Sequence, residues 1–282
     1  MNSFNISVGV GVGLRASFQL WLSLFERLAP IEGQIKTALT AAPVTHHDET
    51  GILVKGKLHW LHVTCTAFWT YLFVHPNRGR KALESPQSIF SNCTGWTVHD
   101  CWASYFSVGK GRHSLCGAHL LRELQALIEA DSDWAKLMQT FLLELYRLTR
   151  PGPLPVTHHA FWRAEYEAIC GLADKVEVLP LPASRGRPRQ SKGRNLLDRL
   201  VIHQDAVLAF AFEPGVAFTN NQAERDLRAV KVKQRVSNCF RTESGAAHYA
   251  RLAGFISTMR KNKQDVLAQL TNVLSGSFQW AT

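Results

Sequence analysis

A run of β-branched and aromatic residues between positions 42 and 76 constrains the fold of this chain more than any other feature. The run reads APVTHHDETGILVKGKLHWLHVTCTAFWTYLFVHP, a composition typical of strands in an antiparallel meander. A turn signal at KGK and a weaker one near CTA divide the run into segments of strand length. Because most of the remaining chain has helical character, we expect an α/β fold.

The spacing of apolar residues and the positions of helix breakers predict the other elements. GWTVHD, residues 95–100, predicts a short strand. Residues 20–40 predict a helix that breaks at Pro30, whereas the glycine- and valine-rich residues before about 20 favour no element. Further helices are predicted over residues 116–130, over 133–175 with an interruption at RPGPLP, and over 195–212.

This order of elements predicts one α/β core that is interrupted by a helical insertion. Residues 180–194 hold three prolines and two glycines, so they predict a linker, and five of the last ten are Lys or Arg. We expect an N-terminal segment at 1–40, helical after about 20; the first part of the core at 41–120; the helical insertion, with its basic linker, at 121–215; and the rest of the core with C-terminal helices at 216–282.

The composition favours a globular protein with a polyanionic partner. The 282 residues carry a formal charge of +10, and 46% are hydrophobic; nucleic acid is the commonest partner of such a basic chain. No apolar run approaches the roughly 20 residues of a membrane span, so we expect no membrane association. The six cysteines occur without a CxxC pair and without a secretory signal, which favours reduced thiols in a cytoplasmic protein.

The segment FTNNQAERDLRAVKVKQRV, residues 218–236, predicts a helix on which a charged row borders an apolar stripe. The stripe consists of Ala223, Leu227 and Val230. The row follows the i, i+4, i+7, i+11 spacing of a helix face and consists of Glu224, Arg228, Lys231 and Arg235. Two interpretations stay open: a capping box from Asn221 to Glu224 with an ordinary Glu–Arg pair, or a functional carboxylate followed by bases.

Three carboxylates lie on separate predicted elements: Asp48 in the first strand segment, Asp100 at the end of the short strand and Glu224 at the helix start. A two-metal site for phosphoryl transfer needs carboxylates from separate elements, because hard cations prefer oxygen ligands. Single acids at strand ends are more often turn or cap residues. The competing acids are Asp198, Asp205 and Glu213 for the Glu224 position and, for the Asp48 position, Glu49, which should face the other side of its strand.

Seven sequence blocks then point to a family. They are HHDETG, GKLHWLHVTCT, HPNRGRKAL, VHDCWASY, LCGAHLLREL, RGRPRQSKGRNLLDRL and NNQAERDLRAVKVKQRVSNCFR. In this order, over roughly residues 22–275, they closely resemble the catalytic part of the insertion-sequence-66 family of bacterial transposases. That family belongs to the Asp-Asp-Glu transposases. The resemblance therefore implies a ribonuclease-H-like mixed sheet with flanking helices, and it maps the three family acids onto Asp48, Asp100 and Glu224.

The resemblance also implies an activity, cofactors and partners. The expected function is metal-dependent DNA cleavage and strand transfer, with the three acids holding two Mg²⁺ or Mn²⁺ ions. The expected partner is double-stranded DNA, both transposon ends and target, bound by a homo-oligomer in the cytoplasm at the nucleoid. The expected DNA-binding residues are Arg185, Arg187, Arg225, Arg228, Lys231, Lys233 and Arg235. Fuller family members carry helix-turn-helix-like and zinc-binding segments before this part, so we expect a truncated chain; the alternative function is a non-catalytic DNA-binding relic.

Other motifs allow two interpretations each. Cys116 and His119 form a CxxH pair that either packs and hydrogen-bonds or binds a metal, with His113 and Cys101 as the nearest further ligands in sequence. RGRP at 185–188 is either a minor-groove hook or a basic linker. The histidines that flank the aspartates favour structural roles over substrate contact; they are His46, His47 and His99.

Overall fold

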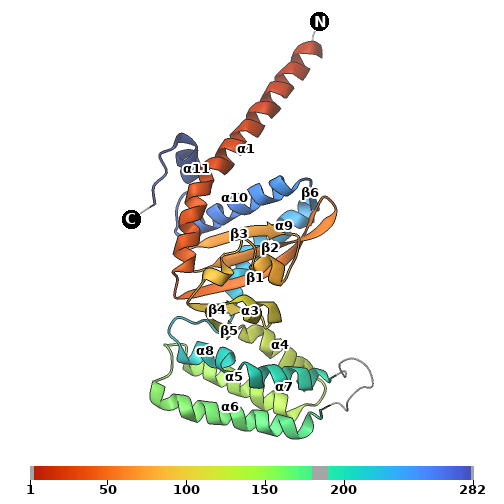
Figure 1. Ribbon diagram of the computed structural model, residues 1–282, viewed down its shortest axis with the longest axis vertical. Coiled ribbons are helices and arrows are strands. Elements are labelled where there is room, and N and C mark those ends of the chain that lie inside the picture. Colours follow the sequence, from red (N-terminus) through yellow and green to blue (C-terminus); the bar gives the residue numbers. More distant parts are fainter. Residues whose placement is uncertain (1–2, 180–189, 281–282) are drawn as a thin grey trace. The chain divides into compact units, whose positions relative to one another are not determined.

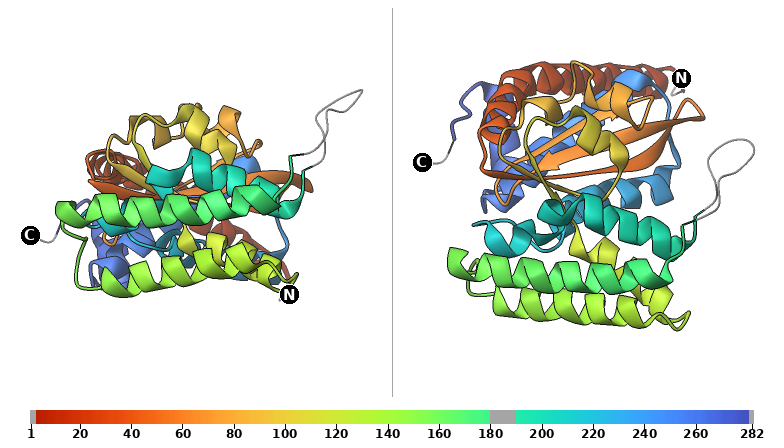
Figure 2. Two further views of the ribbon diagram at one scale, coloured as in Figure 1. Left: turned by 90° about the horizontal axis from the view of Figure 1, so that it is seen from below. Right: turned by 60° about the horizontal axis from the view of Figure 1, so that its bottom comes forward.

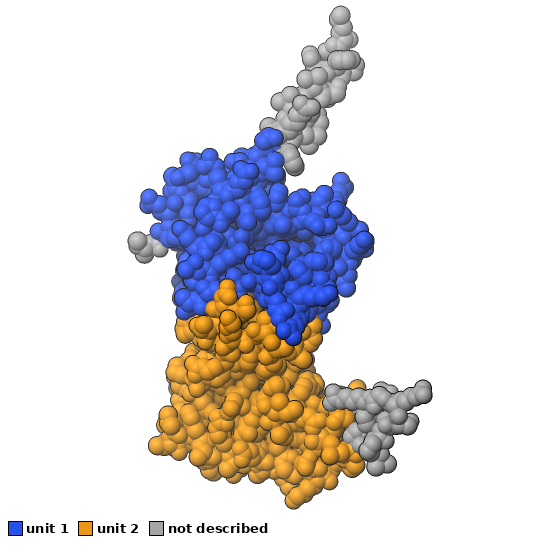
Figure 3. All heavy atoms as spheres, in the orientation of Figure 1, with its two compact units in different colours: residues 1–41, 49–89, 225–282 blue, residues 42–48, 90–224 orange. Residues whose placement is uncertain are grey.

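The computed structural model describes residues 3–179 and 190–280, with side chains from residue 19 onward within those ranges. Two compact units divide the chain (Figure 3), and each consists of segments that are separate in sequence. Unit 1 comprises residues 1–41, 49–89 and 225–282, and unit 2 comprises residues 42–48 and 90–224. Both units contain helices and strands, and strand pairs are both parallel and antiparallel, so the predicted mixed α/β class is confirmed.

The strands of unit 1 form the predicted meander. Their order is β3, β2, β1, with β1 at Val44–Val54, β2 at Lys57–Cys65 and β3 at Thr70–His75; β1 enters this unit at Glu49. β2 and β3 are antiparallel, from Trp60 opposite His75 to Cys65 opposite Thr70. The turn signal KGK is confirmed. Lys55 and Gly56, with φ of 51° and 73°, join β1 to β2 as a two-residue turn, which needs two left-handed residues.

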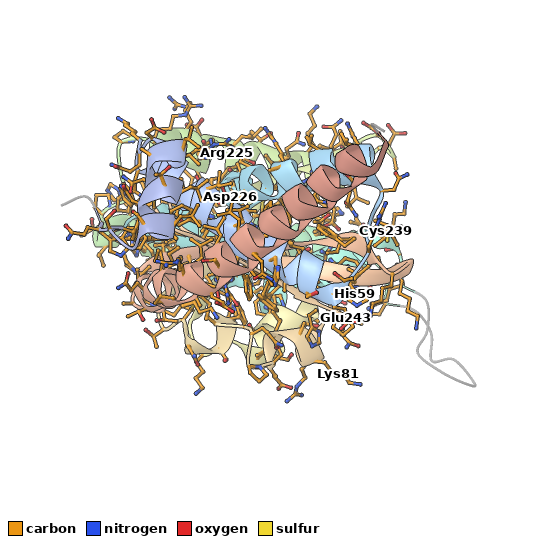
Figure 4. All side chains as sticks on the ribbon, turned by 90° about the horizontal axis from the view of Figure 1, so that it is seen from above. His59, Lys81, Arg225, Asp226, Cys239 and Glu243 are labelled. Carbon is orange, nitrogen blue, oxygen red and sulfur yellow. The ribbon has the colours of Figure 1, made fainter. Side chains whose placement is uncertain are left out.

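The end of this hairpin is held by a short strand and the helix after it. β6, Cys239–Phe240, pairs in parallel with Leu53 and Val54 of β1. The Gly56 N–H donates to the Cys239 Sγ at 3.3 Å, and Lys55 Nζ lies 3.4 Å from a Glu243 carboxylate oxygen. Figure 4 labels Cys239 and Glu243 at this end.

The helices of unit 1 are α1 at Ser3–Thr40, α2 at Arg80–Leu83, α10 at Glu243–Lys261, α11 at Val266–Ser275 and the part of α9, Asn221–Ser237, that follows Glu224. Of these, α1 and α10 pack on β3, and α1, α10 and α11 contact one another (Figure 1). α1 corrects two expectations, because it includes residues before 20 and continues through Pro30. Buried Leu28 and Ile35 lie on opposite sides of Pro30 in the same apolar core, which stabilises the helix across the proline.

Parallel strands form the sheet of unit 2. β1 pairs with β4, Trp96–His99, with Thr45 opposite Thr97 and His46 opposite Val98. β4 pairs with β5, Arg112–Leu115, and His99 stands opposite Leu115. The predicted strand at 95–100 is thus confirmed, whereas β5 and the helix α3, Ala103–Val108, were not predicted.

Further helices of unit 2 follow β5 in the described part of the chain. They are α4 at Gly117–Ile128, α5 at Asp133–Leu148, α6 at Val156–Val176, α7 at Lys192–Ile202 and α8 at Gln204–Phe212. Successive helices contact one another, and Figure 2 shows α5 and α6 running alongside each other. Their apolar faces share one core with Trp96, Val98 and Leu115 of the strands. The expected linker at 180–194 ends earlier than predicted, because Ser191 caps α7 by accepting the Arg194 N–H. Within the described residues, none of the helices combines the length and apolar character needed to cross a membrane.

Candidate active site

The register of the parallel strands in unit 2 predicts that Asp48 lies beside Asp100. Because His46 stands opposite Val98, continuing the pairing by two residues brings Asp48 beside Asp100. Because His99 stands opposite Leu115, the next residue, Cys116, lies beside Asp100 on its other side. Continued in this way, the register predicts that Asp48, Asp100 and Cys116 stand beside one another, with Asp100 and Cys116 just beyond the carboxyl ends of β4 and β5. The carboxyl ends of parallel strands are where α/β folds commonly bind ligands.

Hydrogen bonds fix the chain around Asp100. Its Oδ1 accepts the Trp102 N–H at 3.1 Å, which starts the turn into α3. Its carbonyl oxygen bonds to His99 Nδ1, and His99 Nε2 lies 2.9 Å from His113 Nδ1. Asp100 thus stabilises the turn after its strand, as acids at strand ends usually do, and one of its carboxylate oxygens makes the hydrogen bond of that turn.

Asn220 connects the first strand to the start of α9. Its side chain is 2% exposed; its Oδ1 accepts from His46 Nδ1 at 3.1 Å, and its Nδ2 donates to the His47 carbonyl at 2.7 Å. Its backbone N–H donates to Cys116 Sγ at 3.2 Å, and its carbonyl accepts the Glu224 N–H at 3.3 Å. One buried side chain therefore fixes the helix that carries Glu224 against the strand that carries Asp48.

Glu224 stands in the first turn of α9, and the apolar stripe predicted beside it is buried. The capping box expected from Asn221 is not formed in the expected register. The helix begins at Asn221 and its first accepting carbonyl belongs to Asn220, so Glu224 is the fourth helical residue instead of the third.

The Glu224 carboxylate lies in a group with Cys116 and His119. One ligand atom of each residue lies within 4.8 Å of the others. Among the described residues, this is the group in which three or more His, Cys, Asp or Glu side chains come that close together. Gly117 lets the Phe218 ring pack against the start of α4, because a Cβ at position 117 would come within 2.2 Å of that ring. His113 and Cys101, the nearest further candidates in sequence, do not belong to this group.

The histidines near the aspartates have structural partners. His47 Nε2 lies 2.8 Å from the Thr45 hydroxyl, and burial lowers the His47 pKa well below its ordinary value. Burial likewise lowers the pKa of His99 to about 3, against the effect of its bond to the Asp100 carbonyl. Both rings are therefore neutral at pH 7, in agreement with the structural interpretation.

The competing acids are engaged elsewhere. Glu49 is buried and its carboxylate lies 2.6 Å from Arg78 Nε, on the face of β1 opposite to that of Asp48. In unit 2 the other three form ion pairs: Asp198 with Arg194 at 2.5 Å, Asp205 with Arg163 at 2.6 Å and Glu213 with Arg112 at 3.7 Å. These partners favour Glu224 as the third acid.

The basic residues of α9 differ in exposure. Arg228, Lys231 and Arg235 are exposed, and the helix confirms the spacing that gives them one face with Glu224. Arg225, labelled in Figure 4, is exposed as well. Lys233 is half-buried, and its Nζ lies 3.7 Å from the centre of the Phe240 ring, so its ammonium group makes a cation–π contact within the protein. Arg185 and Arg187 lie outside the described residues.

Asn220 is the site residue that the sequence interpretation did not single out. Its signal was the NN pair before the helix, which resembled a cap. The donor set of Asp48, Asp100 and Glu224 fits a hard divalent cation, because all three supply carboxylate oxygens.

Comparisons with known proteins complete the description of this site. A family model described as "Transposase IS66 family" matches residues 9–248, a range that contains Asp48, Asp100, Cys116, Asn220 and Glu224. No curated protein matches the chain.

Proposed function

The chain belongs to the IS66 family of transposases, and on this premise we propose that it cleaves DNA and transfers strands with Asp48, Asp100 and Glu224 as metal ligands. The ions are two Mg²⁺ or Mn²⁺, and the substrates are the two ends of an insertion sequence and a target duplex. We also propose that the mixed sheet is ribonuclease-H-like, with Asp48 and Asp100 at its parallel strands and Glu224 on the helix α9.

The observation that carries this proposal is the chain of contacts from β1 to α9. The parallel register, continued by two residues, predicts Asp48 beside Asp100, and Asn220 ties the first turn of α9 to His46 and His47, the residues just before Asp48. Glu224 follows in that first turn, and its carboxylate lies within 4.8 Å of Cys116, the strand-end neighbour of Asp100. These contacts support a site to which acids from three separate elements contribute, at one end of the unit 2 sheet.

The protein's part in the reaction is to position acids and phosphates. Bound divalent ions supply Lewis-acid activation of the attacking and leaving oxygens. Three neighbouring carboxylates repel one another, so their approach costs free energy that the fold must supply. The Trp102 N–H fixes one oxygen of Asp100, and Asn220 fixes the backbone of Glu224. The buried neutral histidines add no positive charge that would compete for these carboxylates.

DNA binding is assigned to the exposed bases of α9. Arg228, Lys231 and Arg235 follow Glu224 on one helix face and contact phosphates. Each Ala replacement should weaken binding equally for all sequences and reduce the salt slope by about one unit. Arg147→Ala is the control, because Arg147 is exposed on α5 and already paired with Glu144 at 2.6 Å. A sequence-specific loss would contradict phosphate contact.

The chemistry is tested with Glu224→Gln, which keeps the size and removes the charge. Strand transfer of pre-cleaved ends with Mg²⁺ should fall by more than about 100-fold, since a lost ligand exceeds the cost of a lost outer-shell group. DNA affinity should persist, and the melting temperature without metal should stay level or rise, because one of three repelling charges is gone.

Glu213→Gln is the matched control, since Glu213 is a competing acid that pairs with Arg112. It should retain strand transfer. If Glu224→Gln retains strand transfer, or if only Glu213→Gln loses it, Glu224 is not a metal ligand. A wild-type chain that binds DNA and transfers no strand would instead identify the chain as a DNA-binding relic.

A further inference from the structure

Cys116, His119 and Glu224 form a second donor set, which differs in chemistry from the three carboxylates of the proposed magnesium site. The set is one thiol sulfur, one imidazole nitrogen and one carboxylate oxygen, all within 4.8 Å of one another. A tetrahedral ion with bonds of about 2.0–2.3 Å holds its ligand atoms about 3.3–3.8 Å apart. The widest pair therefore needs to close by at most about 1.5 Å, which a change of side-chain torsion at Glu224 supplies.

Burial raises the pKa of the Cys116 thiol, and backbone N–H donors on the sulfur oppose that shift. Cys116 is 1% exposed and immediately precedes α4, where backbone N–H groups point out of the helix start. The Asn220 N–H donates to this sulfur at 3.2 Å, and the N–H groups of Ala118 and His119 also bond to it. N–H donors on sulfur offset the charge of a thiolate, the form that binds metals.

The imidazole of His119 has an unsatisfied atom. Its Nδ1 is buried, and in the described part of the chain it has no hydrogen-bond partner. A buried ring nitrogen without a partner costs free energy, and coordination by a cation is one way to offset that cost. The half-buried ring follows Cys116 by three residues, so the first turn of α4 holds both ligands together.

We propose that Cys116, His119 and Glu224 bind a thiophilic divalent cation, with Zn²⁺ as the best match. Sulfur and imidazole donors favour Zn²⁺ over Mg²⁺, which prefers oxygen ligands throughout. Three protein ligands leave one position for water or a phosphate oxygen, as in zinc sites that act on substrates. The site stands on its own geometry and requires no strand-transfer activity.

Co²⁺ in place of Zn²⁺ tests the site without DNA. Wild-type protein with one equivalent of Co²⁺ should show a thiolate-to-cobalt charge-transfer band and the intense visible bands of a four-coordinate ion. Cys116→Ser should lose the charge-transfer band, and Zn²⁺ affinity should fall by more than about 100-fold in Cys116→Ser, His119→Gln and Glu224→Gln. Zinc-edge X-ray absorption on the wild type should show one sulfur among nitrogen and oxygen neighbours.

Cys101→Ser is the matched control, because Cys101 is a half-buried thiol of the same unit that lies outside the group. It should retain the wild-type spectrum. Circular dichroism without metal checks that each variant is folded. A wild type without a thiolate band, or a band that survives in Cys116→Ser and disappears in Cys101→Ser, would overturn the proposal.

One consequence rests on the proposed function. If Glu224 also holds Mg²⁺, Zn²⁺ competes for that carboxylate and inhibits strand transfer at saturating Mg²⁺. Cys116→Ser should then need more than about 100-fold more Zn²⁺ for the same inhibition. Equal zinc sensitivity of the two proteins would overturn the competition, whereas loss of transfer in both without zinc would count against the proposed function alone.

Discussion

Replacement of Asn220 by Ala tests the connection on which the candidate site depends. The change removes the acceptor for His46 Nδ1 and the donor for the His47 carbonyl, at a position that is 2% exposed. A buried polar group left without a partner costs about 1–3 kcal/mol. His46 is only half-buried and regains part of that cost from water, so we expect a loss of about 2–4 kcal/mol in the free energy of unfolding.

Urea unfolding measures this loss as a lower midpoint at unchanged slope. Asn221→Ala is the control, because Asn221 is the exposed neighbour and should change stability by no more than about 0.5 kcal/mol. Asn220→Asp separates the two bonds: it keeps the acceptor for His46, removes the donor for His47 and adds a negative charge near Asp48. It should therefore lose stability as well, and more at neutral than at acidic pH.

Strand transfer gives a second measurement on the same proteins. Asn220→Ala should reduce it even where the variant is fully folded, because the first turn of α9 is no longer tied to β1. If Asn220→Ala costs as little stability as Asn221→Ala, the bonds to His46 and His47 do not hold the helix start, and the site as described is wrong.

Three further changes test the fold. Asp226→Ala should cost about 3–5 kcal/mol in urea unfolding, because it leaves Lys261, 2.6 Å away and 11% exposed, as a buried charge without its partner. Burial lowers the pKa of His62 to about 4, so the unfolded chain binds a proton at a higher pH than the folded chain does. The contribution of neutral His62 to the free energy of unfolding is therefore fully present above pH 6.5, and it falls by up to about 1.4 kcal/mol per pH unit between pH 6.5 and 4. His62→Phe should flatten that part of the pH–stability profile, and an unchanged profile would contradict the assignment. Gly95→Ala should lower the melting temperature by overpacking worth about 1–3 kcal/mol, because its Cβ would lie 2.4 Å from the Pro43 carbonyl, and wild-type stability would refute that contact.

The sequence was informative where local pattern and tertiary structure agree. The meander and its KGK turn follow from β-branched residues and from a glycine that accepts a left-handed conformation. β5 was missed because RHSL is short and polar at its start, and its pairing with β4 is what makes it a strand. The continuation of α1 through Pro30 was missed for a related reason, since packing on a distant core outweighs the local cost of proline.

The candidate site shows the same division. Asp48 and Asp100 were recognisable as acids at strand positions, and the alternation of β1 correctly separated Glu49 from Asp48. The role of Asn220 was not readable, because its partners are 174 and 173 residues away in sequence. The nearness of Glu224 to Cys116 depends on the same long-range contact, so no local spacing announces it.

The packing of α1 has a consequence for synthesis of the chain on the ribosome. Leu28 and Ile35 are buried with Phe255, Met259 and Val273, and the Arg251 guanidinium donates to the Phe25 carbonyl across 226 residues of sequence. At about 5–20 residues per second, those partners emerge roughly 10–45 seconds after α1. During that interval the apolar stripe of α1 can contact only Tyr71, Phe73 and Ile89 of that core, and the C-terminal half of the core is missing. Nascent chains arrested before α10 should therefore be cut readily within α1 and should bind chaperones there.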